Sequence, residues 1–213
     1  MAKQLYIFGI GGLAREVFGW LRAEQSILLR NFAGFLISNI SSDSPSDLFG
    51  YPVSDLKNLP VPTEQFDYLL CVGSSDTRCR LSTELMLAGG NAIGFVSKTS
   101  LVGENVSIGH GVIINPRSSV SSGAVIGDFT VVNCGTGIGH DCIIGKFVTI
   151  LGSSAINGNV TIGDFATIGS GVIIHPRKKI GENSTVAMGA VVFRNVAKHS
   201  TVYGNPAKRL RSK

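Results

Sequence analysis

A histidine followed directly by an acidic residue occurs once in this sequence, at His140-Asp141. Imidazole changes charge near neutral pH, so its chemistry is proton transfer, and a neighbouring carboxylate can orient the ring. We interpret His110 and His175, which lack such a neighbour, as exposed corner residues. What His140 can do depends on the elements that hold it.

Those elements follow from a repeat of hexads. Val or Ile occupies every sixth position from Val102 to Val192, which gives sixteen unbroken hexads over residues 102–197. A fixed short period predicts a solenoid. Because strand side chains alternate between two faces, a hexad suits one short strand and a corner, and three hexads close one triangular coil. The aliphatic residue and the small residue four places later should point inward.

The coil length places residues in space. Position 158 lies three hexads after His140, so it should stack on the histidine at the spacing of neighbouring strands, about 4.8 Å. Glycine at position 158 allows another group to approach the backbone closely. The same register stacks Ser170 beneath Met188.

A metal site is not expected in the repeat. Catalytic zinc needs several converging ligands, typically three imidazoles. His110 and His140 fall on different sides of the coil, because they are five hexads apart and a coil contains three.

The first hundred residues lack the repeat and predict an α/β unit. A buried strand at 3–8 runs into a glycine turn at 9–12, and Val17, Phe18 and Leu21 follow with helical spacing. Strand, glycine turn and helix form the context of a nucleotide-binding loop, whose backbone amides can hold phosphate. Further predicted elements are strands at 32–37, 66–72 and 92–96 and a helix at 80–88. A small Rossmann-like unit results, with its ligand at the carboxyl ends of the strands.

Three interpretations of the glycine turn stay open: a nucleotide-sugar site, a dinucleotide site and a structural turn. A dinucleotide domain places an acidic residue at the end of the second strand, where this chain has Ile37 and Ser38. The segment is also short for a full dinucleotide domain. A nucleotide-sugar site is therefore favoured.

Composition narrows the partners. Four cysteines without a Cys-x-x-Cys pair are typical of free thiols in a reducing cytoplasm, and the sequence has no evident signal peptide or membrane span, so no membrane partner is expected. The formal charge is +5, and two interpretations of the basic residues stay open: a site for a phosphate-bearing ligand and a solvated surface. No nucleic-acid-binding motif accompanies the charge, so DNA and RNA are not expected partners. Much of the basic excess lies late in the chain, at Arg177, Lys178, Lys179, Arg194, Lys198, Lys208, Arg209, Arg211 and Lys213.

Taken together, these features resemble the hexapeptide-repeat nucleotide-sugar N-acetyltransferases and the related sialic acid O-acetyltransferases, a family that includes bacillosamine- and perosamine-type sugar acetyltransferases. The resemblance spans essentially the whole chain. It implies a Rossmann-like nucleotide-sugar-binding domain at 1–96, a left-handed parallel β-helix at 97–198 and a C-terminal tail at 199–213. It also implies acetyl-CoA as co-substrate, no metal, and a cytoplasmic homotrimer that serves bacterial surface glycan synthesis such as O-antigen. Outward Val and Ile residues, at Val125, Val131, Ile143 and Ile173, are expected to leave apolar faces for a partner.

The resemblance also implies roles for single residues. In such enzymes His140 would be the general base and Asp141 would orient it, with direct transfer of the acetyl group. Residues expected at the acetyl-CoA and oxyanion site are Gly158, Thr149, Ser170 and Met188. Residues expected to bind the substrate nucleotide are Gly11, Gly12, Leu13, Ile37, Ser38 and Gly73.

Three functions remain after this comparison. The first is N-acetylation of a nucleotide-linked amino sugar, most simply a 4-amino-deoxy sugar. The second is O-acetylation of sialic acid or another sugar hydroxyl, with the same base and donor. The third is a non-catalytic β-helix scaffold, which the His140-Asp141 pair and the closing segment at 203–208 argue against.

Overall fold

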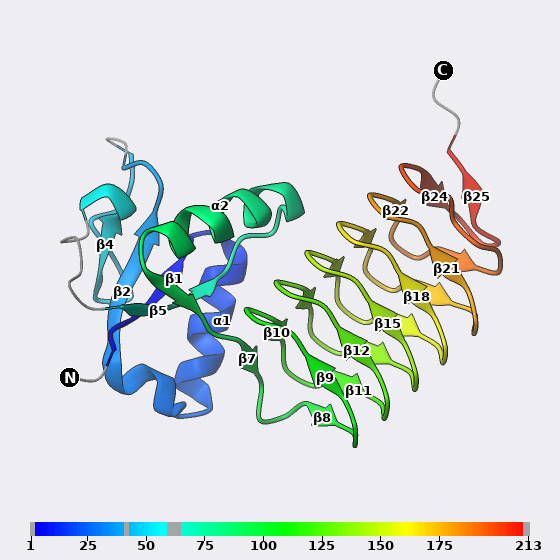
Figure 1. The fold of residues 1–213 in the computed structure, drawn as a ribbon, viewed down its shortest axis with the longest axis horizontal. Helices are drawn as coiled ribbons and strands as arrows, with labels where there is room; N and C mark the ends of the chain where they lie inside the picture. Colours follow the sequence, from blue (N-terminus) through cyan, green and yellow to red (C-terminus); the bar gives the residue numbers. More distant parts are fainter. Residues whose placement is uncertain (1–2, 41–42, 59–64, 211–213) are drawn as a thin grey trace. The chain divides into compact units, whose positions relative to one another are not determined.

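The computed structural model describes residues 3–40, 43–58 and 65–210 (Figure 1). The chain forms two compact units, Met1–Ile93 and Gly94–Lys213. Within the described residues, no helix has the length and apolar character needed to cross a membrane.

The first unit is built on a six-stranded sheet in the order β3-β4-β2-β1-β5-β6. All its pairings are parallel except the antiparallel pair β3–β4. Strands β1, β2 and β5 are nearly continuous runs of buried apolar residues, as expected for a parallel sheet covered on both faces. The strands are β1 (Leu5–Phe8), β2 (Phe32–Ile37), β3 (Asp47–Leu48), β4 (Tyr51–Asp55), β5 (Phe66–Leu70) and β6 (Gly90–Ala92).

Two α-helices, α1 (Gly12–Ala23) and α2 (Ser75–Leu87), and two short 3-10 turns, Ile27–Asn31 and Leu56–Asn58, connect these strands. The helix expected at 80–88 begins earlier, at Ser75, because the Ser74 hydroxyl accepts a hydrogen bond from Thr77 N at 3.3 Å and caps the first turn. The strand expected at 92–96 is split into β6 and a separate strand, β7 (Phe95–Val96). The hairpin β3–β4 had no counterpart among the expected elements.

The second unit is a parallel β-solenoid with three faces (Figure 1). The first face consists of β7, β10 (Ile113–Ile114), β13 (Val131–Val132), β16 (Thr149–Ile150), β19 (Thr167–Ile168), β22 (Thr185–Val186), β24 (Thr201–Tyr203) and the antiparallel β25 (Lys208–Arg209). The second face consists of β8 (Leu101–Val102), β11 (Ser119–Val120), β14 (Gly137–Ile138), β17 (Ala155–Ile156), β20 (Ile173–Ile174) and β23 (Val191–Val192). The third face consists of β9 (Ser107–Ile108), β12 (Val125–Ile126), β15 (Ile143–Ile144), β18 (Thr161–Ile162) and β21 (Lys179–Ile180).

The register between coils is three hexads, as predicted. Ile126 pairs with Ile144, and Ile144 pairs with Ile162. The aliphatic and small positions of the hexads together form one continuous buried core. In the first coil Val102 and Ile108 are partly exposed, because no earlier coil covers β8 and β9.

The outward aliphatic residues differ from the expectation at one position. Val125, Ile143 and Ile173 are exposed, whereas Val131 is buried. Exposed aliphatic surface is therefore concentrated on the second and third faces.

The corners between faces give the solenoid three edges, named here after the faces that they join. At each corner the fourth residue of the hexad commonly adopts a left-handed conformation, as Asp141 does with φ of 56° and Phe147 with φ of 55°. The third residue precedes it, and on the second–third edge this position is occupied in successive coils by Ser122, His140, Gly158 and Pro176.

Candidate active site

His140 and Asp141 form the corner between β14 and β15, on the second–third edge. The imidazole Nδ1 lies 2.8 Å from Asp141 Oδ2, and both side chains are more than half exposed, at 63% and 61%. An ionised carboxylate can only accept a hydrogen bond, so Nδ1 donates and Nε2 keeps its lone pair in the neutral ring. The pair therefore presents Nε2 as the atom that can take a proton.

Gly158 lies one coil further along, as the register predicts, and Asn159 N donates to His140 O at 2.8 Å. A Cβ added to Gly158 would lie 2.8 Å from His140 Cε1 and 2.9 Å from Cδ2, and it would also contact Nε2. Any larger residue would thus displace the imidazole. The sequence places glycine where the ring and the backbone of the next coil must meet.

The backbone N–H of Gly158 meets no acceptor among the described residues. At two matching positions of the third–first edge, an aspartate from the next coil supplies that acceptor. His110 N donates to Asp128 Oδ1 at 3.0 Å, and Lys146 N donates to Asp164 Oδ1 at 2.8 Å. The residue above Gly158 is Pro176, whose side chain has no acceptor. A donor is therefore left available beside Nε2.

A shallow groove of about 430 Å³ adjoins this corner on the second face. It is bounded by His140, Gly158 and Pro176. Apart from Ile138 and Ile156, its remaining lining residues are small or polar and leave room for a ligand: Ser119, Ser121, Gly137, Gly139, Ala155 and Asn157. Beneath the corner the Cys142 side chain points inward, its thiol donates to Asn157 O at 3.1 Å, and burial raises its pKa.

The other residues expected to bind acetyl-CoA lie elsewhere on the solenoid. Ser170 and Met188 stack in adjacent coils as predicted, with Gly189 N donating to Ser170 O at 2.8 Å, but they occupy the first–second edge. Thr149 is buried in β16 on the first face. Within one chain, these three residues do not meet His140.

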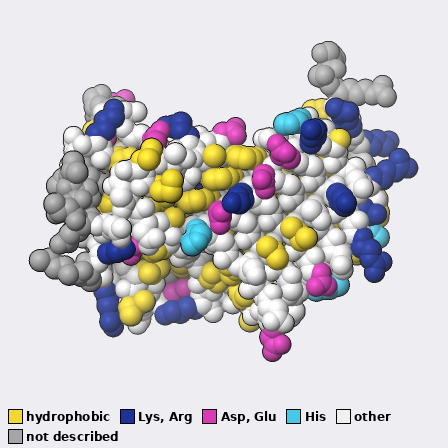
Figure 2. Space-filling model, viewed as in Figure 1, with side chains coloured by type: hydrophobic (Ala, Val, Ile, Leu, Met, Phe, Trp, Pro, Cys, Tyr) yellow, Lys and Arg dark blue, Asp and Glu magenta, His cyan; other side chains and the backbone are white. Residues whose placement is uncertain are grey.

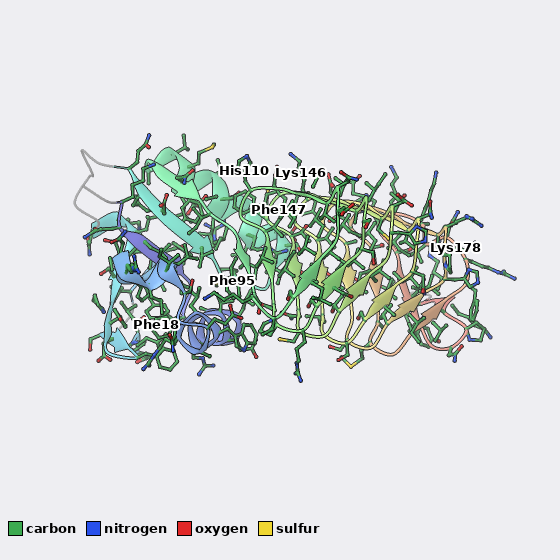
Figure 3. The ribbon with its side chains drawn as sticks, turned by 90° about the horizontal axis from the view of Figure 1, so that it is seen from below. Phe18, Phe95, His110, Lys146, Phe147 and Lys178 are labelled. Atoms are coloured by element: carbon green, nitrogen blue, oxygen red, sulfur yellow. The ribbon has the colours of Figure 1, made fainter. Side chains whose placement is uncertain are left out.

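The third–first edge differs from the edge that carries His140, because it is covered by a stack of half-buried phenylalanines. Phe129, Phe147 and Phe165 have ring centroids 5.3 and 5.2 Å apart. Figure 3 shows Phe147 beside Lys146, with His110 further along the same edge. Lys146 Nζ also pairs with Asp128 Oδ2 at 2.9 Å, and the hydrogen bond from Lys146 lowers the pKa of Asp128.

In the first unit, the expected phosphate loop lies where β1 meets α1. Gly11 is the N-cap of α1, with no side-chain cap and no acidic residue in the first turn. A Cβ at Gly11 or Gly12 would meet no atom within 4 Å, so the backbone here is open to a ligand. Leu13 is half-buried in the first turn, and Gly73 is exposed in the loop after β5. An uncapped helix N-terminus of this kind favours an anion.

At the end of β2, residues from a neighbouring strand accompany Ile37 and Ser38. Asp55 in β4 lies opposite Ile37 in β2. Its carboxylate accepts hydrogen bonds from Ile40 N at 3.2 Å and from Lys57 N at 2.9 Å. Lys57 Nζ lies 3.4 Å from Asn39 Oδ1. These polar groups were missed from the sequence, because recognising them requires knowing that β4 lies beside β2.

Basic side chains gather at the end of the solenoid, as Figure 2 shows. A cavity of about 350 Å³ there has an apolar lining that includes Val192, Val196 and Val202, and Arg194, Lys208 and Arg209 also line it. Arg211 and Lys213, expected in the same basic cluster, lie outside the described residues.

No protein-family model and no curated protein sequence matches the chain. Solved structures match it over its length. WeeI from Acinetobacter baumannii AYE aligns with a TM-score of 0.87 and 29% identity, covering 98% of this chain and 100% of WeeI. The acetyltransferase domain of PglB from Neisseria gonorrhoeae FA1090 aligns with a TM-score of 0.86 and 27% identity, covering 98% and 100%. PerB from Caulobacter crescentus, solved with CoA and GDP-perosamine, aligns with a TM-score of 0.86 and 25% identity, covering 99% of each chain.

The repeat, the three-faced solenoid and these matches define the class of the protein, which is an acyltransferase built on hexapeptide repeats. More narrowly, the chain matches the hexapeptide-repeat sugar acetyltransferases from end to end, and the resemblance drawn from its sequence is confirmed.

Proposed function

We propose that this protein transfers the acetyl group of acetyl-CoA to the amino group of a nucleotide-linked amino sugar. The observation that carries the proposal is the His140–Asp141 pair packed against Gly158, whose N–H meets no acceptor among the described residues. PerB, which has the same architecture, was solved with CoA and GDP-perosamine. A 4-amino-deoxy sugar destined for a bacterial surface glycan such as O-antigen fits this comparison.

In the proposed reaction the neutral sugar amine attacks the thioester carbonyl directly. A C–N bond forms and the carbonyl oxygen becomes an oxyanion, which the N–H of Gly158 stabilises. His140 Nε2 takes one proton from the nitrogen, while Asp141 holds the ring. The intermediate collapses with cleavage of the C–S bond, and the thiolate recovers that proton from His140, giving the amide and free CoA.

Acetyl-CoA would extend along Ser170 and Met188, with Thr149 nearby. Because those residues and His140 occupy different parts of one chain, a complete site calls for a neighbouring copy, which is the argument for a homotrimer. The exposed Val125, Ile143 and Ile173 are apolar surface that such packing would cover. Sedimentation at working concentration tests this assembly, and a monomer would contradict it.

The nucleotide would bind to the first unit, which we propose to be Rossmann-like. Gly11, Gly12, Leu13 and Gly73 would receive the phosphates. Ile37 and Ser38 would lie beside the nucleoside. We further propose a left-handed solenoid and a cytoplasmic location, the latter because all four cysteines are free thiols.

The test is a thiol-release assay with acetyl-CoA against UDP-, GDP- and dTDP-linked 4-amino sugars, with the product analysed by mass spectrometry and NMR. We expect one nucleotide series to give turnover and an amide at the sugar nitrogen. Acetylation of a hydroxyl, with sialic acid included in the panel, would favour the O-acetyltransferase instead. Absence of turnover with every acceptor would contradict the enzymatic proposal and favour a scaffold.

A further inference from the structure

The largest fully buried side chain of the described residues is charged. Arg78, in the first turn of α2, is 1% exposed. Its Nη1 donates to Val72 O at 3.0 Å and to Gly73 O at 2.8 Å. Burying a guanidinium is costly unless its donors are satisfied, so this arrangement must be maintained by the loop that surrounds it.

Arg78 keeps its positive charge at neutral pH. Burial lowers its pKa to about 10, which still leaves the guanidinium protonated. The guanidinium lies on the buried side of the loop that follows β5. The dipoles of the Val72 and Gly73 carbonyls, which point toward it, partly compensate its charge.

The direction of those carbonyls fixes the direction of the neighbouring amides. A trans peptide is planar, with its C=O and N–H pointing to opposite sides. Since the carbonyls of Val72 and Gly73 turn inward to Arg78, the N–H groups of Gly73 and Ser74 turn outward. Both residues are exposed. Successive outward amides in a turn make a concave site that attracts anions.

This loop lies beside the glycine turn of the first helix. Cys71 N donates to Phe8 O at 2.9 Å, and a Cβ at Gly9 would approach Cys71 O to 2.7 Å. The open amides of the β1–α1 turn and the outward amides after β5 therefore share the carboxyl edge of two adjacent strands.

We propose that Arg78 is a positioning residue for the diphosphate of the acceptor: by holding two carbonyls, it aims the amides of Gly73 and Ser74 at the phosphates. The inference rests on the proposed function, since it assumes that a nucleotide binds this edge. It adds a residue that never touches the ligand yet sets the affinity of the site for its phosphate groups.

The experiment compares Arg78→Gln and Arg78→Lys with a matched control, Arg80→Gln. Arg80 is on the same helix but is exposed and pairs with Glu84 at 2.6 Å. Calorimetry would measure the binding of UDP, GDP and dTDP and of the corresponding nucleosides. For the nucleotide that the unchanged protein binds, Arg78→Gln should raise the Kd of the diphosphate about tenfold, because aligned amide hydrogen bonds to a charged group are lost. The Kd of the nucleoside should change by less than about twofold, because its contacts are not aimed by this loop.

Kinetics adds a second readout. In Arg78→Gln the KM for the nucleotide sugar should rise about tenfold, with kcat and the KM for acetyl-CoA nearly unchanged, because binding alone is affected. Arg78→Lys keeps the charge but not the two-carbonyl geometry, so it should show a smaller loss, roughly threefold. Arg80→Gln should resemble the unchanged protein.

The outcomes separate the two levels of the proposal. Failure of the unchanged protein to bind any nucleoside diphosphate would overturn the nucleotide site, and this inference with it. Normal binding by the unchanged protein, together with equal effects of Arg78→Gln on diphosphate and nucleoside, would overturn the role of Arg78 alone. If Arg78→Gln fails to fold, Arg78→Lys provides the test. An unchanged ratio of diphosphate affinity to nucleoside affinity in Arg78→Lys would then overturn the role of Arg78.

Discussion

Two edges of the solenoid use the same hexads to different ends. On the third–first edge, aspartates from the next coil accept from His110 N and Lys146 N, phenylalanines stack, and Lys146 pairs with Asp128. On the second–third edge, the matching N–H of Gly158 meets no acceptor among the described residues, and it lies against an exposed imidazole. The third–first edge uses its polar groups to hold neighbouring coils together. The second–third edge leaves polar groups available for a ligand.

The difference between the two edges lies in whether the backbone N–H at this corner position has an acceptor. A buried or half-buried donor without a partner is costly, and a solenoid multiplies that cost over its coils. At Gly158 such a donor lies beside the exposed imidazole of His140. The groove beside that corner, with its small residues, leaves room for a substrate to satisfy the donor.

Replacing His140, the proposed base, should have the largest effect on the contrast between the two edges. His140→Ala should lower kcat by roughly 10² to 10⁴, the usual contribution of a general base. Because the side chain is exposed, the melting temperature should hardly change. The matched control is His110→Ala, at the same hexad position of the third–first edge, and it should retain activity. Equal activity of the two variants would contradict the distinction between the edges.

Filling the space above the imidazole should come next. Gly158→Ala should lower kcat by roughly 10², because the new methyl group would meet the ring and crowd the N–H proposed as the oxyanion donor. The φ angle is ordinary, so little of the cost comes from the backbone. In a His140→Ala background the same substitution should cost much less, which a double-mutant cycle on kcat measures. Full additivity would mean that the two residues do not act together.

Opening the aromatic stack should affect stability and leave catalysis intact. Phe147→Ala removes the central ring, which contacts both neighbours. We expect unfolding in urea to show a loss of about 2 kcal/mol, below the value for a fully buried ring because Phe147 is half-buried. The acetyl-transfer rate should be unchanged at temperatures where the variant is folded. A loss of kcat without a loss of stability would reverse the assignment of this edge.

One substitution should give the second–third edge, where we propose catalysis, the hydrogen bond between coils that is found on the third–first edge. Pro176→Asp places a carboxylate one coil above Gly158, as Asp164 lies above Lys146. The new acceptor should bind the N–H of Gly158 and lower kcat about tenfold, while stability is kept or raised. Pro176→Ala supplies no acceptor and is the control, with activity near that of the unchanged protein. Similar activity of the two variants would argue against Gly158 as the oxyanion donor.

The smallest effect concerns pH and Asp128. The hydrogen bond from Lys146 lowers the pKa of Asp128 in the folded state below its ordinary value. Its contribution is therefore present above the ordinary pKa and is lost as pH falls through the lowered one. Asp128→Asn should reduce the melting temperature slightly at neutral pH and flatten its decline on acidification. High salt should shrink the difference, and a difference independent of both pH and salt would exclude the ion pair as its cause.

The solenoid could be predicted almost entirely, because its aliphatic period and coil length are written in the sequence. The stacking of Gly158 on His140 followed from the register alone. The first unit was predicted less fully. Strand β3 has only two residues, and Pro52 interrupts the apolar pattern of β4, so the position of Asp55 beside Ile37 could not be foreseen.

The burial of Arg78 depended on three-dimensional structure. Arginine is expected at a surface, and nothing near Arg78 in the sequence marks it as buried. The separation of Ser170 from His140, by contrast, follows from the register, since they are five hexads apart and a coil contains three. Geometry showed that they occupy different edges.

The complete coils have a consequence for how such a protein can change length. An insertion of three hexads adds one step of about 4.8 Å and returns every later residue to its own face, while an insertion of one hexad turns all later residues onto the next face. The separation between the His140 corner and the basic end can therefore grow or shrink only in whole steps. Duplication of a whole coil would therefore lengthen the solenoid by one step and leave the His140 corner unchanged.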